Sequence, residues 1–149
     1  VESLICYVGE RQEIKVQDLQ SLYISKKKQK TWQLAEYLTW GEGVGFPLDG
    51  ISDADFYPLL MQVRSRLHVG MKIKEGVEPD GIAPRLMQKY LSYSQSLDKG
   101  YFQEAFGVVY EIERLSRSGQ FSTSFLFDML YVKLYDLRES NRCFPVSPN

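Results

Sequence analysis

The chain has 149 residues, of which 44% are hydrophobic and 25% are charged, a composition typical of an ordinary globular domain. Its net charge of -1 at pH 7 argues against a dedicated, strongly basic nucleic-acid-binding domain, so any DNA contact is expected to be weak and local. The two cysteines lie at opposite ends of the chain and His68 is the only histidine. The chain therefore offers few of the side chains that form zinc sites, disulfide frameworks or nucleophile–base pairs.

These counts predict a protein without catalytic residues, metal or cofactor. No run of about 18 apolar residues occurs, so no membrane-spanning helix is predicted. The cysteine usage suits a reducing cytoplasm. The chain begins with Val1 and not with Met, and we expect it to be an excised piece of a longer protein.

In chain order, residues 2–8 have the apolar character of a helix end that Gly9 stops, and a short helix is expected from Gln17 to Ile24. The run Lys26–Lys30 has no apolar residue. It predicts a solvated linker and a domain boundary near residues 25–31. Thr31 is expected to cap a helix over residues 32–40, and the glycine-rich stretch 41–50 is expected to be a loop.

A long helix is predicted from a cap at Asp53 or Asp55 to about Glu75, with Pro58 in its first turn. Its buried stripe is Phe56, Leu60, Val63, Leu67 and Met71. On another face, basic side chains recur every four residues and form what we call the basic ridge: Arg64, His68 and Lys72, with Arg66 counted beside them. A solvated helix face is the simpler interpretation of this ridge, and a functional polar surface is the alternative.

Three more helices complete the pattern. One begins at Pro84 and buries a face that we expect to contain Leu86, Met87, Tyr90, Leu91, Ser94 and Leu97. The next is capped by Asp98, keeps a 3.6-residue rhythm to about Arg117 and stops at Gly119. The last starts after residues 122–124 and reaches about Arg138, and the tail over residues 141–149 is expected to be flexible. Five to six helices with almost no strand pattern predict an all-α helical bundle.

The last helix is apolar or aromatic around most of its circumference, which requires burial on more than one side. Two interpretations stay open. The helix is either the centre of the bundle, or it packs inward with one face and meets a partner with another. The second interpretation gives the candidate subunit-interface residues Phe125, Phe127, Tyr131 and Tyr135, together with the basic ridge at Arg64, His68 and Lys72.

Several segments, read in order, resemble the C-terminal region of the delta subunit of the bacterial DNA polymerase III clamp loader. Each motif is weak alone, and their order and spacing carry the resemblance over nearly the whole chain. They are Leu4–Gly9 followed by Ile14 and Val16–Leu19, then Trp32–Gly41, Leu59–Arg66, Ala83–Leu91, the run from Leu97 through Ala105 and Glu113 to Gly119, and Phe125–Leu134. Two positions depart from the family pattern. The glycine-rich stretch 41–50 stands where the family continues into another helix, and Asp128 stands near a position that often holds Glu.

The resemblance implies that residues 1–25 end a lid-like second domain, that residues 31–140 form a helical collar domain and that residues 141–149 are a flexible tail. In the family this collar domain packs against the delta-prime and tau/gamma subunits. Contact with the sliding clamp belongs to an N-terminal domain that this chain does not include. The implied function is a cytoplasmic, non-catalytic scaffold for clamp loading during DNA replication. The alternative from the residues themselves is a small helical nucleic-acid-binding module that uses Arg64, Arg66, Lys72 and the Lys26–Lys30 run.

Overall fold

The computed structural model describes residues 29–42 and 51–142. By its internal contacts the chain divides into two units, residues 1–32 and residues 33–149, and the account below concerns the second. The elements predicted before residue 25, most of the 41–50 loop and most of the tail after residue 141 lie outside the described residues.

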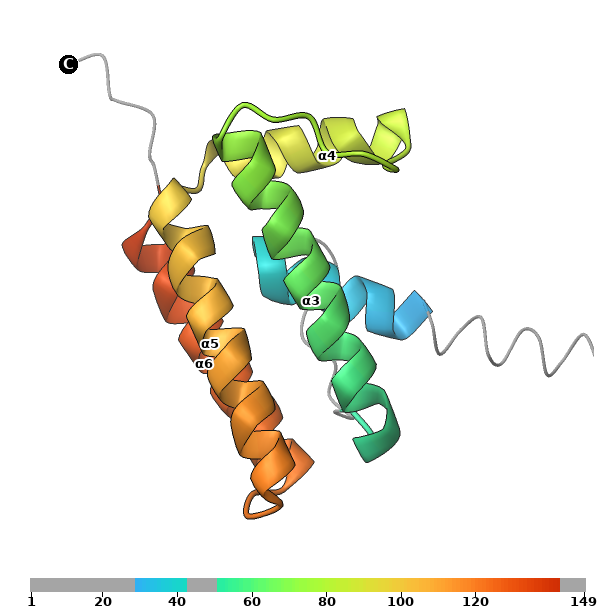
Figure 1. The fold of residues 1–149 in the computed structure, drawn as a ribbon, viewed down its shortest axis with the longest axis vertical. Coiled ribbons are helices and arrows are strands. Elements are labelled where there is room, and N and C mark those ends of the chain that lie inside the picture. Colours follow the sequence, from blue (N-terminus) through green and yellow to red (C-terminus); the bar gives the residue numbers. More distant parts are fainter. Residues whose placement is uncertain (1–28, 43–50, 143–149) are drawn as a thin grey trace, which may run out of the picture. The chain divides into compact units, whose positions relative to one another are not determined.

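The described residues form five helices and no strand, which confirms the all-α helical bundle (Figure 1). They are a helix over residues 29–40, α3 (Asp53–Lys74), α4 (Pro84–Gln95), α5 (Lys99–Ser118) and α6 (Thr123–Ser140). We call the part of the first helix that belongs to the second unit the 33–40 segment. It ends at Gly41, whose φ of 75° is the left-handed conformation that glycine adopts without strain.

Two predicted helix starts need correction. Thr31 lies inside the first helix and does not cap it, because Gln29 and Lys30, both good helix formers, are already helical. Ser52 occupies the cap position of α3, and its hydroxyl donates a hydrogen bond of 2.8 Å to the Asp55 carboxylate. Pro58 therefore lies inside α3, in its second turn and not in its first.

The ends of α5 and α6 follow the sequence signals closely. The Asp98 side chain caps α5 by accepting a hydrogen bond from the backbone N–H of Lys99, and Gly119 ends the helix with φ of 72°. At the start of α6 the Ser122 hydroxyl accepts a hydrogen bond of 3.2 Å from the backbone N–H of Phe125. Each side chain satisfies a donor that a helix start leaves without a partner.

The antiparallel pair α5 and α6 lies side by side, with α3 packed along α5 and α4 crossing the C-terminal end of α3 (Figure 1). The start of α5 also meets the end of α6, where the backbone N–H of Asp98 donates to the carbonyl of Asn141 at 3.1 Å. The core between the helices is apolar and aromatic. Its largest enclosed side chains include Trp40, Leu60, Leu67, Tyr101, Phe102, Ile112, Leu130 and Leu134.

The predicted inner faces of the helices are largely those that the structure buries. In α3 the stripe at Phe56, Leu60, Val63 and Leu67 is fully buried, and Met71 is half-buried. In α4 the prediction is wrong at Leu91, which is exposed. The reason is that α4 packs mainly on α3, so only a narrow edge of it, at Tyr90 and Ser94, is enclosed.

Candidate functional site

Helix α6 exposes more large apolar side chains than the other described helices. Its inward side is formed by Leu126, Leu130 and Leu134, all buried against the other helices. Its outward side remains apolar: Phe125, Val132 and Tyr135 are 47%, 51% and 46% exposed. We call these three residues the outer face of α6. Within residues 29–42 and 51–142 the other helices cover only one side of α6, which favours the interpretation that a second side meets a partner.

The outer face extends past the start of the helix. Phe121, in the turn before α6, is exposed and stacks on the Phe125 ring with 5.4 Å between ring centroids. Half-buried Met129 lies between Phe125 and Val132 at the four- and seven-residue spacing that places side chains on one helix face. Large apolar side chains gathered in this way on a protein surface typically mark a site of interaction with another macromolecule.

Acidic side chains lie among the exposed apolar ones. Asp128 and Asp136 are both exposed and are eight residues apart, on the same side of α6 as Phe125 and Val132. A nucleic acid presents a dense row of phosphates, which carboxylates repel. The outer face therefore suits a protein surface that offers apolar groups and some positive charge.

A row of stacked tyrosines joins α6 to the 33–40 segment. The rings of Tyr37 and Tyr131 are 6.2 Å apart and nearly parallel, and Tyr135 stacks on the other side of Tyr131 at 6.3 Å. The hydrogen bond with Tyr37, aided by desolvation, raises the pKa of the Tyr131 hydroxyl. Tyr131 therefore belongs partly to the bundle itself, while Tyr135 ends the row at the surface.

The predicted interface residues thus separate into two groups. Phe125 and Tyr135 lie on the outer face, and Tyr131 lies at its edge. Phe127 does not belong there, because its side chain is only 2% exposed and packs in the core. The sequence alone does not separate Phe125 from Phe127, since most positions from Phe125 to Leu137 are apolar or aromatic and their periodicity does not define the buried side.

The residues of the basic ridge on α3 also differ in their exposure to solvent. Arg64 and His68 are exposed, and the His68 ring meets the Phe106 ring edge-on at 6.3 Å. Lys72 is half-buried. Arg66 is buried and points away from the ridge, so it does not serve the nucleic-acid surface for which the sequence nominated it. Of the Lys26–Lys30 run, only residues 29 and 30 are among the described residues, and they are helical.

Arg66 instead belongs to a polar cluster inside the bundle, which sequence inspection missed. Its Nε donates to the Glu36 carboxylate at 3.0 Å, and its NH1 donates to the carbonyl of Gln62 at 2.9 Å. The hydroxyl of Tyr90 donates to the same Glu36 oxygen. Burial, reinforced by this hydrogen bond, raises the pKa of Tyr90. The cluster ties the 33–40 segment to α3 and α4. No local sequence pattern predicts it, because Arg66 and Tyr90 are 30 and 54 residues from Glu36 along the chain.

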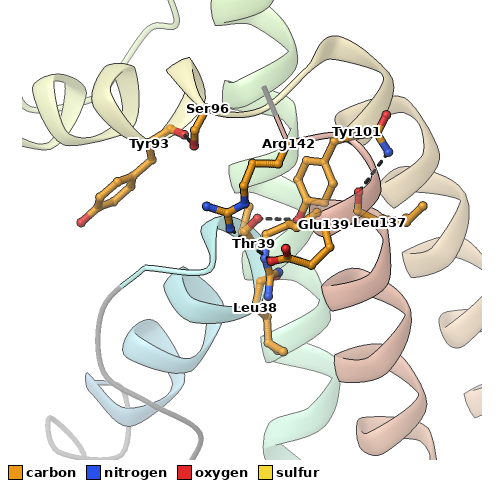
Figure 2. Close-up of polar contacts among 10 residues, drawn as sticks. Leu38, Thr39, Tyr93, Ser96, Tyr101, Leu137, Glu139 and Arg142 are labelled. Atoms are coloured by element: carbon orange, nitrogen blue, oxygen red, sulfur yellow. Dashed lines mark hydrogen bonds and ion pairs between the residues drawn. The ribbon is translucent and has the colours of Figure 1, made fainter. Parts of the chain in front are cut away.

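A second polar contact holds the carboxyl end of the 33–40 segment (Figure 2). The Tyr101 hydroxyl of α5 donates to the carbonyl of Thr39, and the buried guanidinium of Arg138 on α6 donates to the carbonyl of Leu38 at 2.5 Å. The last carbonyls of a helix lack partners within the helix and carry partial negative charge, so a phenol and a guanidinium are well suited to them.

This arrangement predicts an alkaline loss of stability. Burial raises the pKa of Tyr101 to about 12 from an ordinary value of 10, although Arg138 acts to lower it. The folded state therefore retains the proton while the unfolded state loses it. The stability contribution is complete below pH 10 and disappears as the pH rises toward 12, by about 2–3 kcal/mol in total.

Urea unfolding of the wild-type chain and of Tyr101→Phe at pH 8, 9, 10 and 11 measures the contribution of the Tyr101 hydroxyl to the free energy of unfolding. The variant is expected to be less stable at pH 8, since it lacks the hydrogen bond to Thr39, and its stability should fall less steeply above pH 10. Tyr90 titrates in the same direction and is present in both proteins, so it cancels in the comparison. Parallel pH profiles for the two proteins would show that Tyr101 does not contribute.

Comparisons of the chain with protein-family models, with curated proteins and with solved structures found no match. Among the helices that the structure describes, none is both long enough and apolar enough to span a bilayer. In the same residues, no group of three or more His, Cys, Asp or Glu side chains is placed to hold a metal ion.

Proposed function

We propose that this chain is a non-catalytic scaffold segment of a bacterial replicative clamp loader, the C-terminal region of a delta-type subunit. In this proposal the collar-like bundle packs against the delta-prime and tau/gamma subunits through the outer face of α6. The observation that carries the proposal is the exposed apolar surface at Phe125, Val132 and Tyr135 on a helix whose other side is already buried. The ordered resemblance of the segments from Leu4 to Leu134 supports the choice of family.

The magnitudes are adequate for such an interface. Full burial of a side chain such as Phe or Val contributes about 1.5–3 kcal/mol relative to full exposure, so burying the exposed half of each contributes about 1 kcal/mol. Phe121, Phe125, Val132 and Tyr135 together can then supply several kcal/mol. A few aromatic and aliphatic anchors of this kind usually dominate the affinity of a protein–protein contact.

The proposal assigns no chemistry to the chain. With one histidine and two widely separated cysteines, the sequence offers few of the side chains on which nucleophilic or zinc-dependent catalysis depends. The cytoplasmic location expected from the cysteine usage belongs to the same proposal. Nucleic-acid binding, the alternative considered from the sequence, has less support because Arg66 is buried and the outer face of α6 carries Asp128 and Asp136.

The test is the binding of the chain to purified delta-prime and tau/gamma subunits, measured by sedimentation or biolayer interferometry. The double variant Phe125→Ala/Val132→Ala should bind at least about 20-fold more weakly, since truncating two half-exposed anchors removes about 2 kcal/mol. Both positions face outward, so the variant should remain folded, which far-UV circular dichroism checks.

A matched control removes exposed apolar groups from other helices. Tyr57 on α3 and Leu91 on α4 are about as exposed as the two anchors, so Tyr57→Ala/Leu91→Ala should leave binding nearly unchanged. Absence of binding by the folded wild-type chain would contradict the proposed function. Equal weakening by both double variants would show that the contact is not made through α6.

A further inference from the structure

A hollow of about 180 Å³ opens on the surface between α3 and α5, away from the outer face of α6. Its lining consists of Arg64 from α3 and Phe106, Val109, Tyr110 and Glu113 from α5. Its volume is similar to that of a cavity, about 150 Å³, that admits a benzene molecule in another protein. One Leu or Phe side chain is therefore of a suitable size to enter it.

The apolar part of the lining includes an aromatic ring that has little other contact. Tyr110 is 68% exposed, the most exposed of the large hydrophobic side chains in the described residues. Phe106 is half-buried and meets the His68 ring edge-on. An entering apolar side chain would cover the exposed part of Phe106 and pack against the Tyr110 ring, whereas Val109 is already almost fully buried.

Of the charged side chains at the hollow, the carboxylate is largely covered and the guanidiniums are exposed. The Glu113 side chain is 11% exposed, and one of its oxygens accepts a hydrogen bond of 2.7 Å from Arg117, whose side chain is 73% exposed. Arg64 is 3.8 Å from the other oxygen, too far for a hydrogen bond. Two guanidiniums thus share one largely covered carboxylate, so the rim of the hollow carries a net positive charge.

We propose that this hollow is a docking site for an acidic peptide segment of another protein, anchored by one Leu or Phe side chain. The anchor fills the space between Phe106, Val109 and Tyr110, and Asp or Glu side chains beside it pair with Arg64 and Arg117. Because Arg64 makes only a long ion pair of 3.8 Å with Glu113 and its side chain is 55% exposed, it can turn toward an incoming carboxylate with little loss of existing contacts. The site is separate from the subunit interface proposed above, and α6 contributes no residue to its lining.

The test uses fluorescein-labelled ten-residue peptides and anisotropy titration of the 149-residue chain at about 50 mM salt. One pair of peptides carries four Asp residues around a central Phe or a central Leu. A third peptide has Ala in place of the anchor, and a fourth has Lys in place of the acids. At least one of the two anchored acidic peptides is expected to bind about tenfold more tightly than the Ala peptide and the Lys peptide. Its affinity should fall several-fold at about 300 mM salt.

Two variants on the chain locate the site. Arg64→Glu is expected to weaken binding of the anchored acidic peptide at least about tenfold, and Tyr110→Ala several-fold. Arg114→Glu is the control, because Arg114 is also an exposed arginine of this region but pairs with Glu111 and does not line the hollow. The proposal is overturned if neither anchored peptide binds better than the Ala peptide, or if Arg114→Glu weakens binding as much as Arg64→Glu. Neither result bears on the α6 interface, whose variants are measured with different partners.

Discussion

Replacing Gly70 by Ala is expected to destabilise the bundle by about 2–4 kcal/mol, even though Ala is the better helix former. Gly70 is buried in α3 where this helix meets α5. A methyl group added there would lie 2.1 Å from Cε1 of Phe102 and 2.6 Å from two further ring carbons. Ala gains about 1 kcal/mol in helix propensity. Overpacking of a filled core typically costs about 1–3 kcal/mol and occasionally more, and a contact this short belongs to the severe end.

The Phe102 ring has little room to move aside. It is fully buried, and it makes edge-on contacts with Trp40 and Tyr101 at centroid distances of 5.7 and 5.1 Å. Removing the clash between the added methyl group and the Phe102 ring would therefore require a shift of α3 relative to α5. Thermal unfolding should show a melting temperature lower by roughly 4–16 °C, given about 2–4 °C for each kcal/mol in a chain of this size.

Gly107→Ala is the matched control. Gly107 lies in α5 on the exposed side, and a methyl group there would have no atom within 4 Å. With propensity acting alone, this variant should be more stable than wild type by about 0.5–1 kcal/mol. If both glycine variants stabilised the protein, the close approach of α3 and α5 at Gly70 would be contradicted.

The second large effect is expected from Arg138→Met, with a loss of about 2–4 kcal/mol. Met keeps the apolar stem but removes the guanidinium that donates to the Leu38 carbonyl. A hydrogen bond from a charged donor to a buried carbonyl is worth about 1.5–3 kcal/mol, and the attraction to the negative end of a helix adds to it. The vacated carbonyl would then have no water to replace the donor, because Arg138 is 2% exposed.

Arg114→Met provides the comparison. Arg114 donates two hydrogen bonds to Glu111, at 3.1 and 2.7 Å, but this pair lies in solvent. Exposed pairs of this kind contribute little, because water and salt screen them. Chemical denaturation should therefore distinguish the two variants clearly. An Arg138→Met protein as stable as Arg114→Met would contradict the role given to the buried guanidinium.

Helix identity and most helix ends in this bundle are local properties and were predictable from sequence. Gly119 ends α5 and Ser122 begins α6 through contacts within a few residues, and the rhythm of Phe102, Ala105 and Val109 identifies the buried side of α5. The cap of α3, predicted at Asp53 or Asp55, was misplaced by one or three residues because Ser52, Asp53 and Asp55 are all good capping residues. Only the backbone conformation selects among them.

The candidate site was predictable only in part. A helix that is apolar all round indicates a second buried side, but it does not say which side the rest of the chain covers, so Phe125 and Phe127 looked equivalent. Arg66 likewise looked like a neighbour of Arg64. Two residues apart on a helix, however, they point in directions about 200° apart, and the inward one pairs with Glu36. Pairings of this kind depend on how distant segments pack, which no local pattern contains.

The way in which the 33–40 segment is held has a consequence for synthesis in the cell. Short helices of this length are marginal on their own in water. The two side chains that hold its carbonyl end, Tyr101 and Arg138, follow it by 62 and 100 residues along the chain. At about 5–20 residues per second, the ribosome needs roughly 5–20 s to deliver the second of them. Until α6 emerges, Arg138 is absent from the Leu38 carbonyl and Tyr37 lacks Tyr131 as its stacking partner, so the final packing of this segment depends on a helix that follows it by about 100 residues.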